Sequence, residues 1–281
     1  MTSTKKNIAL AGACGRQMPL DVFHDSEKTQ KPIIIFCHGY KGFKDWGVWD
    51  LMAKSFTEKG FFFIKFNFSH NGGTMEDPID FPDLKAFAFN NYTKELKDLE
   101  IVLDWVSSTD FPYADYADTS NISLIGHSRG GGIVIIKASE DKRVKKLITL
   151  AAVSDFASRF PRSSELEKWK KDGVAYVENT RTRQQMPHYF QFYEDFKKHE
   201  ERFTISRAAK DSKIPHLIIH GTEDPTVSVE NAKELQRWSR NSEILLIENG
   251  NHVFGASHPW EKEQLPEQFE QIVEKSIHFL N

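Results

Sequence analysis

A short segment around Ser128 constrains the fold of this chain more than any other feature of its sequence. Residues 126–130 read Gly-His-Ser-Arg-Gly, a G-x-S-x-G pattern. They follow an apolar run at residues 121–125 and lead into a glycine-rich stretch of helical character at residues 130–138. A strand, a sharp turn and a helix in this order hold a serine hydroxyl exposed at a strained elbow. The N-terminus of the helix supplies free N–H groups where an oxyanion would form.

Two further polar residues follow apolar runs in the order that a serine nucleophile requires. Asp224 comes shortly after the run at residues 216–221, and His252 follows the run at residues 243–247. The carboxyl ends of parallel strands meet at one edge of a sheet, so these side chains can approach Ser128. A serine hydroxyl is a weak nucleophile until a base removes its proton and a carboxylate orients that base. The sequence therefore predicts a catalytic triad of Ser128, Asp224 and His252.

Two glutamates compete with Asp224 for the role of the acid. Glu223 directly precedes it, and Glu248 follows the next apolar run. We prefer Asp224 because it lies farther into its loop and because residues 225–227 can fold that loop back over the edge of the sheet. An Asp-Pro pair is also a common turn signal, so a purely structural role is the alternative interpretation of Asp224.

A fourth segment predicts the donors that would stabilise an oxyanion. Residues 31–37 contain a continuous apolar run that leads into His38, Gly39 and Tyr40. A tetrahedral intermediate needs two N–H donors, one from the residue after the nucleophile and one from this loop. We therefore expect the backbone N–H groups of Arg129 and Tyr40 to form an oxyanion hole. An ordinary strand-to-loop turn is the alternative interpretation of this segment.

Apolar runs alternate with helical patterns along most of the chain. In residues 92–107, for example, the apolar residues recur at helical spacing. Strands that alternate with helices predict a mostly parallel sheet covered on both faces. The expected elements are an antiparallel pair at 8–11 and 17–24, strands at 33–37, 61–68 and 146–153, and helices at 49–59 and 92–107.

These segments together resemble the signature set of the α/β-hydrolase superfamily, over roughly residues 7–280. Within it, the chain is most similar to dienelactone-hydrolase-like and cinnamoyl or feruloyl esterase-like enzymes. The resemblance implies an α/β-hydrolase fold, with a mostly parallel twisted sheet, helices on both faces and a cap inserted after the sixth strand. Dienelactone hydrolases use a cysteine nucleophile, so Ser128 at that position favours an ester hydrolase. The matching segments are 38–40, 126–130, 220–224 and 250–252.

The segment between the sixth and seventh expected strands is longer than a crossover requires. A crossover connection needs about a dozen residues, and this segment spans 154–213. We therefore expect an inserted cap at residues 154–213 on a core formed by residues 1–153 and 214–281. Within the cap we expect a helix at 163–171, a hairpin within 174–183 and a helix at 187–199.

Aromatic residues of the expected cap suit an apolar or aromatic acyl pocket. The candidates for substrate contact are Tyr189, Phe192 and Tyr193, together with His70 in a glycine-containing loop. The rings could equally attach the cap to the core, and a turn at a strand end is the commoner explanation for a loop like that of His70. Four arginines could bind a substrate carboxylate, although solvated surface arginines are commoner. These are Arg159, Arg162, Arg181 and Arg183.

The composition is that of one globular enzyme without a nucleic-acid partner. The 281 residues carry a net charge of -3, and lysine and arginine are spread along the chain rather than clustered. Cys14 and Cys37 do not make a disulfide framework and are compatible with a reducing compartment. The first residues lack the apolar stretch of a secretory signal, and no apolar run reaches the ~20 residues that span a bilayer. We expect a cytoplasmic protein without membrane contact; the oligomeric state is not predicted.

These observations predict a serine carboxylester hydrolase that acts on a small to medium ester through an acyl-enzyme. The mechanism needs no cofactor, and the histidines lack the spacing of an H-E-x-x-H metal site. A thioesterase or an acyl-peptidase with the same triad is the nearest alternative. A non-catalytic ligand receptor on a hydrolase scaffold is an alternative of another class, and such a receptor does not need an intact triad.

Overall fold

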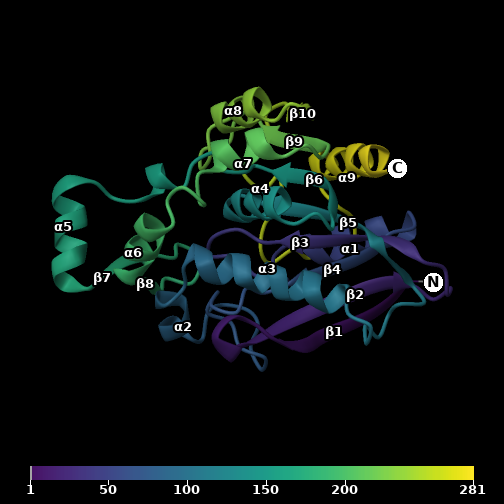
Figure 1. Ribbon diagram of the computed structural model, residues 1–281, viewed down its shortest axis with the longest axis horizontal. Coiled ribbons are helices and arrows are strands. Elements are labelled where there is room, and N and C mark those ends of the chain that lie inside the picture. Colours follow the sequence, from purple (N-terminus) through teal and green to yellow (C-terminus); the bar gives the residue numbers. More distant parts are fainter. Residues whose placement is uncertain (1) are drawn as a thin grey trace.

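A mixed sheet of eight strands runs through the middle of the molecule in the computed structural model, which describes residues 2–281 (Figure 1). Its strands are β1 (Thr2–Ala11), β2 (Gln17–Asp25), β3 (Lys31–Cys37), β4 (Phe62–Phe66), β5 (Ala117–His127), β6 (Val144–Leu150), β9 (His216–Gly221) and β10 (Ser242–Ile247). They lie in the order β1-β2-β4-β3-β5-β6-β9-β10. β2 pairs antiparallel with β1 and β4, and all other neighbours are parallel. The expected antiparallel pair and parallel core are confirmed.

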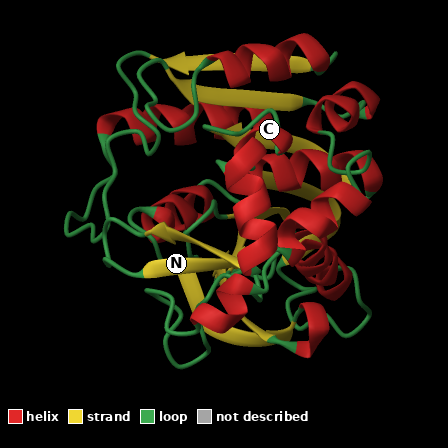
Figure 2. Ribbon diagram, turned by 90° about the vertical axis from the view of Figure 1, so that its left-hand side faces the viewer, coloured by secondary structure: helices red, strands yellow, loops and turns green. Residues whose placement is uncertain are grey.

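Helices cover both faces of this sheet (Figure 2). They are α1 (Trp49–Glu58), α2 (Leu84–Ala88), α3 (Tyr92–Val106), α4 (Arg129–Glu140), α5 (Ser163–Asp172), α6 (Gln191–Lys198), α7 (Ile205–Asp211), α8 (Glu230–Trp238) and α9 (Glu267–Leu280). On β3, Ile33 and Ile35 pack with α3 and α4, whereas Ile34 and Phe36 pack with α1 and α9. A strand buried on both faces requires such a continuous apolar run. None of the helices within residues 2–281 has both the length and the apolar character needed to cross a bilayer.

The chain between β6 and β9 projects beyond one end of the sheet (Figure 1). It contains α5, the antiparallel hairpin of β7 (Val174–Glu178) and β8 (Gln185–Tyr189), and α6, before α7 returns to pack against α4. The expected helix at 187–199 is wrong in its first part, because Pro187 lies opposite Tyr176 in the hairpin and α6 begins only at Gln191. Proline lacks the N–H that a helix interior uses and is tolerated on an edge strand.

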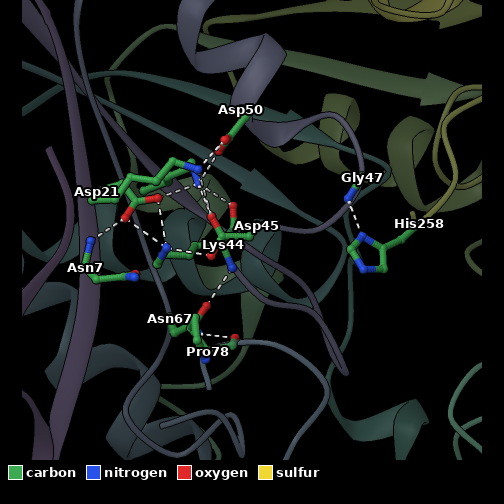
Figure 3. Close-up of polar contacts among 11 residues, drawn as sticks. Asn7, Asp21, Lys44, Asp45, Gly47, Asp50, Asn67, Pro78 and His258 are labelled. Carbon is green, nitrogen blue, oxygen red and sulfur yellow. Dashed lines mark hydrogen bonds and ion pairs between the residues drawn. The ribbon is translucent and has the colours of Figure 1, made fainter. Parts of the chain in front are cut away.

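One open edge of the sheet, β1, contains an irregularity. Its register against β2 shifts between Lys5 and Ile8, and Asn7 adopts a positive φ of 53°. The N–H of Asn7 donates to Oδ1 of Asp21 on β2, at 2.9 Å (Figure 3). A residue that turns its backbone inward in this way interrupts the hydrogen-bonding ladder of the strand.

A buried group of charges lies under the loop that follows β3 (Figure 3). Nζ of Lys65 lies 2.7 Å from Asp21, 2.9 Å from Asp45 and 2.7 Å from Asp50. Nζ of Lys44 lies 2.9 Å from Asp21 and 2.6 Å from Asp45. We call these five residues the basal charge cluster. Each of its charges has a close partner of opposite sign, which offsets the cost of removing it from water.

Candidate active site

Ser128 occupies the sharp turn between β5 and α4. Its φ of 55° and ψ of −118° lie in a region that non-glycine residues rarely adopt, at a cost of about 1–3 kcal/mol. The surrounding backbone holds this conformation, since the N–H of Ser128 donates to the carbonyl of Leu150 at 2.9 Å and the N–H of Gly131 donates to the carbonyl of Ser128 at 3.0 Å. The strand, turn and helix expected around this serine are present.

Two glycines allow the backbone to pack closely around the elbow. A Cβ on Gly39 would lie 2.9 Å from Cβ of Ser128. A Cβ on Gly130 would lie 2.5 Å from the carbonyl oxygens of Cys37 and His38. Neither distance is tolerated between non-bonded atoms. Only glycine therefore brings the loop after β3 this close to the serine.

Asp224 and His252 meet beyond the ends of β9 and β10. Nδ1 of His252 lies 2.7 Å from Oδ2 of Asp224. The other carboxylate oxygen accepts the N–H groups of Thr226 and Val227 at 2.8 and 2.9 Å. Burial alone would raise the pKa of Asp224, but hydrogen bonds from His220, His252 and the Val227 N–H lower this pKa below its usual range. The residue is therefore a carboxylate that can hold the Nδ1–H of His252.

His127 supports the position of His252. The two imidazole rings lie 4.8 Å apart, and Nε2 of His127 is 2.9 Å from the backbone carbonyl of His252. Burial lowers the pKa of His127 to about 3, so its neutral ring donates this hydrogen bond through Nε2–H. No role for His127 was expected from the sequence, where its place directly before Ser128 is the one available signal. Within residues 2–281, Ser128 and His252 share no hydrogen bond.

His38 fixes the loop after β3 from two sides. Its Nδ1 lies 2.9 Å from the carbonyl of Gly39, and its Nε2 lies 3.3 Å from the N–H of Phe68. Burial, with a contribution from the charge of Arg129, lowers the pKa of His38 to about 4. The neutral ring can thus donate to one segment and accept from the other, which fixes the loop where Gly39 approaches Ser128.

A cavity of about 1010 Å³ lies against Ser128. Arg129 and Tyr40, the two expected oxyanion donors, also line it. The projecting segment between β6 and β9 contributes much of the remaining lining, so this segment and the sheet enclose the cavity together. Further aromatic rings of the lining come from Tyr92, Phe156, Phe160, Trp169, Tyr176 and Phe192, and further charged side chains come from Arg159, Glu165, Lys168 and Asp172.

Three of the expected substrate contacts lie outside the lining of this cavity. His70 lines a separate cavity of about 410 Å³, with its Nδ1 2.8 Å from Oγ of Ser69. Tyr189 and Tyr193 pack against neighbouring rings, with centroids 4.7 and 5.4 Å apart. Of the three cap aromatics named from the sequence, Phe192 is the one that lines the cavity beside Ser128.

Tyr40 also joins the loop after β3 to the projecting hairpin. Its hydroxyl oxygen lies 2.7 Å from Nε2 of His188 on β8. Burial, with the nearby charges of Arg129 and Lys41, lowers the pKa of His188 to about 3. Nε2 of the neutral ring accepts a hydrogen bond from the Tyr40 hydroxyl, and this bond connects the two regions that enclose the cavity. Nothing in the sequence analysis indicated this contact.

The guanidinium of Arg129 is surrounded by aromatic rings. Its central carbon lies 4.3 Å from the ring centroid of Tyr40, 5.5 Å from that of Tyr92 and 5.3 Å from that of Phe192. Contacts of this kind attract the cation to the ring faces. Within residues 2–281, its one hydrogen-bond partner is Glu95, whose Oε1 lies 3.5 Å from Nη1.

Glu95 is a buried carboxyl group on α3. Its Oε1 accepts a hydrogen bond from Nδ2 of Asn90 at 2.7 Å, while its Oε2 has no hydrogen-bond partner among the described residues. Burial raises the pKa of Glu95, and the charge of Arg129 only partly opposes this. The sequence analysis treated Arg129 chiefly as a backbone donor and gave Glu95 no role. The available signal was a glutamate on the helical stripe shared with Leu99 and Val102.

The chain matches one protein family over most of its length. Residues 49–270 match the prolyl oligopeptidase family, Peptidase_S9. The "Uncharacterized 31.7 kDa protein in traX-finO intergenic region" of Escherichia coli is 30% identical over 124 residues, which are 44% of this chain and 38% of that protein. "Uncharacterized protein YcjY" of Escherichia coli strain K12 is 28% identical over 159 residues, or 56% of this chain and 47% of that protein. The chain thus aligns with less than half the length of these relatives.

Solved structures share its fold at low sequence identity. Est1E from Butyrivibrio proteoclasticus with bound ferulic acid has a TM-score of 0.73 at 16% identity, over 97% of each chain. A putative hydrolase from Agrobacterium vitis S4 has a TM-score of 0.74 at 17% identity, over 100% of each chain. A putative dienelactone hydrolase from Klebsiella pneumoniae subsp. pneumoniae has a TM-score of 0.60 at 14% identity, over 98% of each chain. The expected α/β-hydrolase resemblance is confirmed, and the chain belongs to the prolyl oligopeptidase family of hydrolases.

Proposed function

We propose that the protein is a serine carboxylic ester hydrolase with Ser128 as nucleophile, His252 as general base and Asp224 as the residue that orients the base. One observation carries the proposal. A strained serine lines a cavity with several aromatic side chains, and a carboxylate–histidine pair with a separation of 2.7 Å follows the strands β9 and β10. This combination supplies the three groups that acyl transfer to serine requires.

The acylation step uses the neutral form of His252. Its Nε2 takes the proton of the Ser128 hydroxyl as Oγ attacks the ester carbonyl. The resulting oxyanion accepts hydrogen bonds from the backbone N–H groups of Arg129 and Tyr40. The intermediate then loses the alcohol, which receives its proton from His252, and the acyl group stays on the serine.

Deacylation repeats these steps with water. A water molecule gives a proton to His252 and attacks the acyl carbon, and the serine recovers a proton as the acid leaves. The Asp224 carboxylate stabilises the imidazolium that forms in each half-reaction. Its lowered pKa keeps it ionised throughout. Because the neighbouring His127 is neutral, it adds no repulsive charge beside that imidazolium.

The division into a core of residues 1–153 and 214–281 and a cap of residues 154–213 fits this proposal. Side chains of α5, β7, β8 and α6 line the cavity and would contact the substrate. The last helix of the segment, α7, packs against α4 and acts as the crossover to β9. The part that covers the substrate therefore ends with α6.

Hydrolysis of p-nitrophenyl butyrate and methyl cinnamate by the wild type and by Ser128→Ala tests the function. We expect Ser128→Ala to lower turnover by at least ~10⁴ and to abolish covalent labelling by a serine-directed phosphonate. The exposed Ser158 provides the matched control, since Ser158→Ala should react like the wild type. Equal labelling of wild type and Ser128→Ala would exclude Ser128 as the nucleophile.

An acyl-peptidase with the same triad is the second candidate, because the family that matches is the prolyl oligopeptidase family. An N-acylated amino acid supplied both as its p-nitrophenyl ester and as its p-nitroanilide separates the two. Cleavage of the anilide that depends on Ser128 would assign a peptidase. Cleavage of the ester alone would assign an esterase.

A further inference from the structure

The Arg129 side chain is an incompletely paired cation beside the proposed nucleophile. A guanidinium carries five N–H donors. Among the described residues, only Nη1 of Arg129 has a hydrogen-bond partner, and that contact is 3.5 Å long. The side chain lines the cavity and keeps 15% of its surface exposed. The remaining donors are therefore available to a molecule in the cavity.

Glu95, the partner of Arg129, does not fully compensate the positive charge of the guanidinium. Glu95 shares the oxygen that faces Arg129 with the amide of Asn90, at the shorter distance of 2.7 Å. Its other oxygen has no hydrogen-bond partner among the described residues. A buried carboxyl group in this state resists ionisation, which is consistent with its raised pKa. The positive charge beside Ser128 is thus only partly compensated by the protein.

The rings around Arg129 restrict how it can be used. Tyr40, Tyr92 and Phe192 lie close to the guanidinium and also line the cavity. They leave the N–H edge as the part of the group that can take a ligand. An N–H edge of arginine matches the two oxygens of a carboxylate, which it binds with two parallel hydrogen bonds.

We propose that Arg129 is a specificity-determining residue that binds a free carboxylate on the substrate. The proposal rests on the proposed function and deepens it. The substrate class is an ester with an apolar or aromatic body and a carboxylate, such as the monoester of a dicarboxylic acid. A single carboxylate is matched by the paired N–H donors of one guanidinium edge.

Matched ester pairs test this assignment. Mono-p-nitrophenyl glutarate and p-nitrophenyl valerate differ in a carboxylate on the acyl group, and 3-acetoxybenzoate and phenyl acetate differ in one on the leaving group. We expect the wild type to prefer the charged member of at least one pair in kcat/KM. Arg129→Met should lower that preference about 10- to 100-fold, the value of a charge-assisted hydrogen bond. Arg129→Lys should recover part of it.

Substitution of Glu95 provides a control, because it should change the preference for the charged ester in the opposite direction. Glu95→Gln removes the carboxyl group that contacts Arg129 among the described residues, so the preference for the charged ester should rise. The double variant Glu95→Gln, Arg129→Met removes both charges of the pair and should show the low preference of Arg129→Met. If Arg129 and Glu95 had a purely structural role, each substitution would change kcat/KM equally for the charged and the neutral ester. Opposite shifts of the preference in the two single variants would contradict such a role.

Binding measurements make the assignment independent of turnover. Calorimetry with 3-phenylpropanoate and its neutral amide should show at least about tenfold tighter binding of the acid to the wild type, and no such difference in Arg129→Met. Absent binding of the acid, or equal binding of acid and amide, overturns the carboxylate site. Ester turnover that survives Ser128→Ala would instead overturn the proposed function and leave the binding result to decide on Arg129.

Discussion

The basal charge cluster and the Arg129–Glu95 pair both contain buried charges, but they are built differently. In the cluster, the ammonium groups of Lys44 and Lys65 lie 2.6–2.9 Å from carboxylate oxygens, and each has more than one partner. In the pair, one contact of 3.5 Å is shared between a cation with free donors and a carboxyl group with an unpaired oxygen. A buried charged group whose hydrogen bonds are all made to protein groups has a structural role. A charged group beside a cavity that keeps unused hydrogen-bond donors is open to a ligand.

The pKa values of the carboxyl groups also differ between the two regions. Burial would raise the pKa of Asp50, but Lys65 and Lys6 lower it below its usual range. Burial also raises the pKa of Glu95, and there the charge of Arg129 is too weakly coupled to reverse the effect. The two carboxyl groups therefore differ in their number of cationic partners and also in exposure, since the side chain of Asp50 is 33% exposed and that of Glu95 is 5% exposed.

The largest effect is expected where a buried charge serves the reaction. Asp224→Asn should lower ester turnover by about 10⁴, because the amide cannot hold His252 in the required tautomer. Folding should change little, since the remaining carbonyl oxygen can still accept the N–H groups of Thr226 and Val227. Steady-state kinetics and a thermal melt measure the two effects. Glu223→Gln is the matched control, and a greater loss of turnover in that variant would show that Asp224 is the wrong acid.

A second prediction compares the two regions directly by their effect on folding. Asp21→Asn removes a carboxylate shared by Lys44 and Lys65 and should lower the free energy of unfolding by about 3–5 kcal/mol. Glu95→Gln removes a carboxyl group with one weak ionic contact and should lower it by about 1 kcal/mol or less. Urea denaturation of the three proteins at pH 7 measures both differences. Equal losses would mean that the comparison between the regions does not hold.

The smallest effect concerns stability at low pH. As the pH decreases, we expect the site to lose stability at a higher pH than the basal charge cluster does. The pKa of His188 is lowered to about 3 in the fold, against an ordinary value of about 6.5. Between these values the unfolded chain binds one more proton, so stability falls as pH decreases, by up to about 1.4 kcal/mol per pH unit.

The experiment is urea denaturation at several values between pH 7 and pH 5. His188→Gln should reduce the slope of stability against pH by this amount. Asp50→Asn should leave the slope unchanged, because the pKa of Asp50 is lowered and its contribution is lost only below the ordinary aspartate pKa of about 3.9. An unchanged slope in His188→Gln would show that the pKa of this histidine is not lowered by folding.

The elements could be predicted because their signals are local. The apolar run of β3 and the glycines around Ser128 dictate a buried strand and a tight turn within a few residues. The pairing of Arg129 with Glu95 joins residues 34 positions apart, and that of Tyr40 with His188 joins residues 148 positions apart. Such contacts depend on how the elements pack, which a single sequence does not specify. The second strand of the hairpin was missed because aromatic residues suit helices and strands alike.

The turn of Asn7 toward Asp21 affects how the protein behaves in a crowded solution. An open edge strand offers unpaired N–H and C=O groups to which a strand of another molecule can add. In β1 the register shift at Asn7 interrupts that row, and the exposed Lys5 places a positive charge beside it. A second chain would meet a broken template and a charged side chain along this edge. The contact that reaches the basal charge cluster thus also protects the sheet against aggregation through β1.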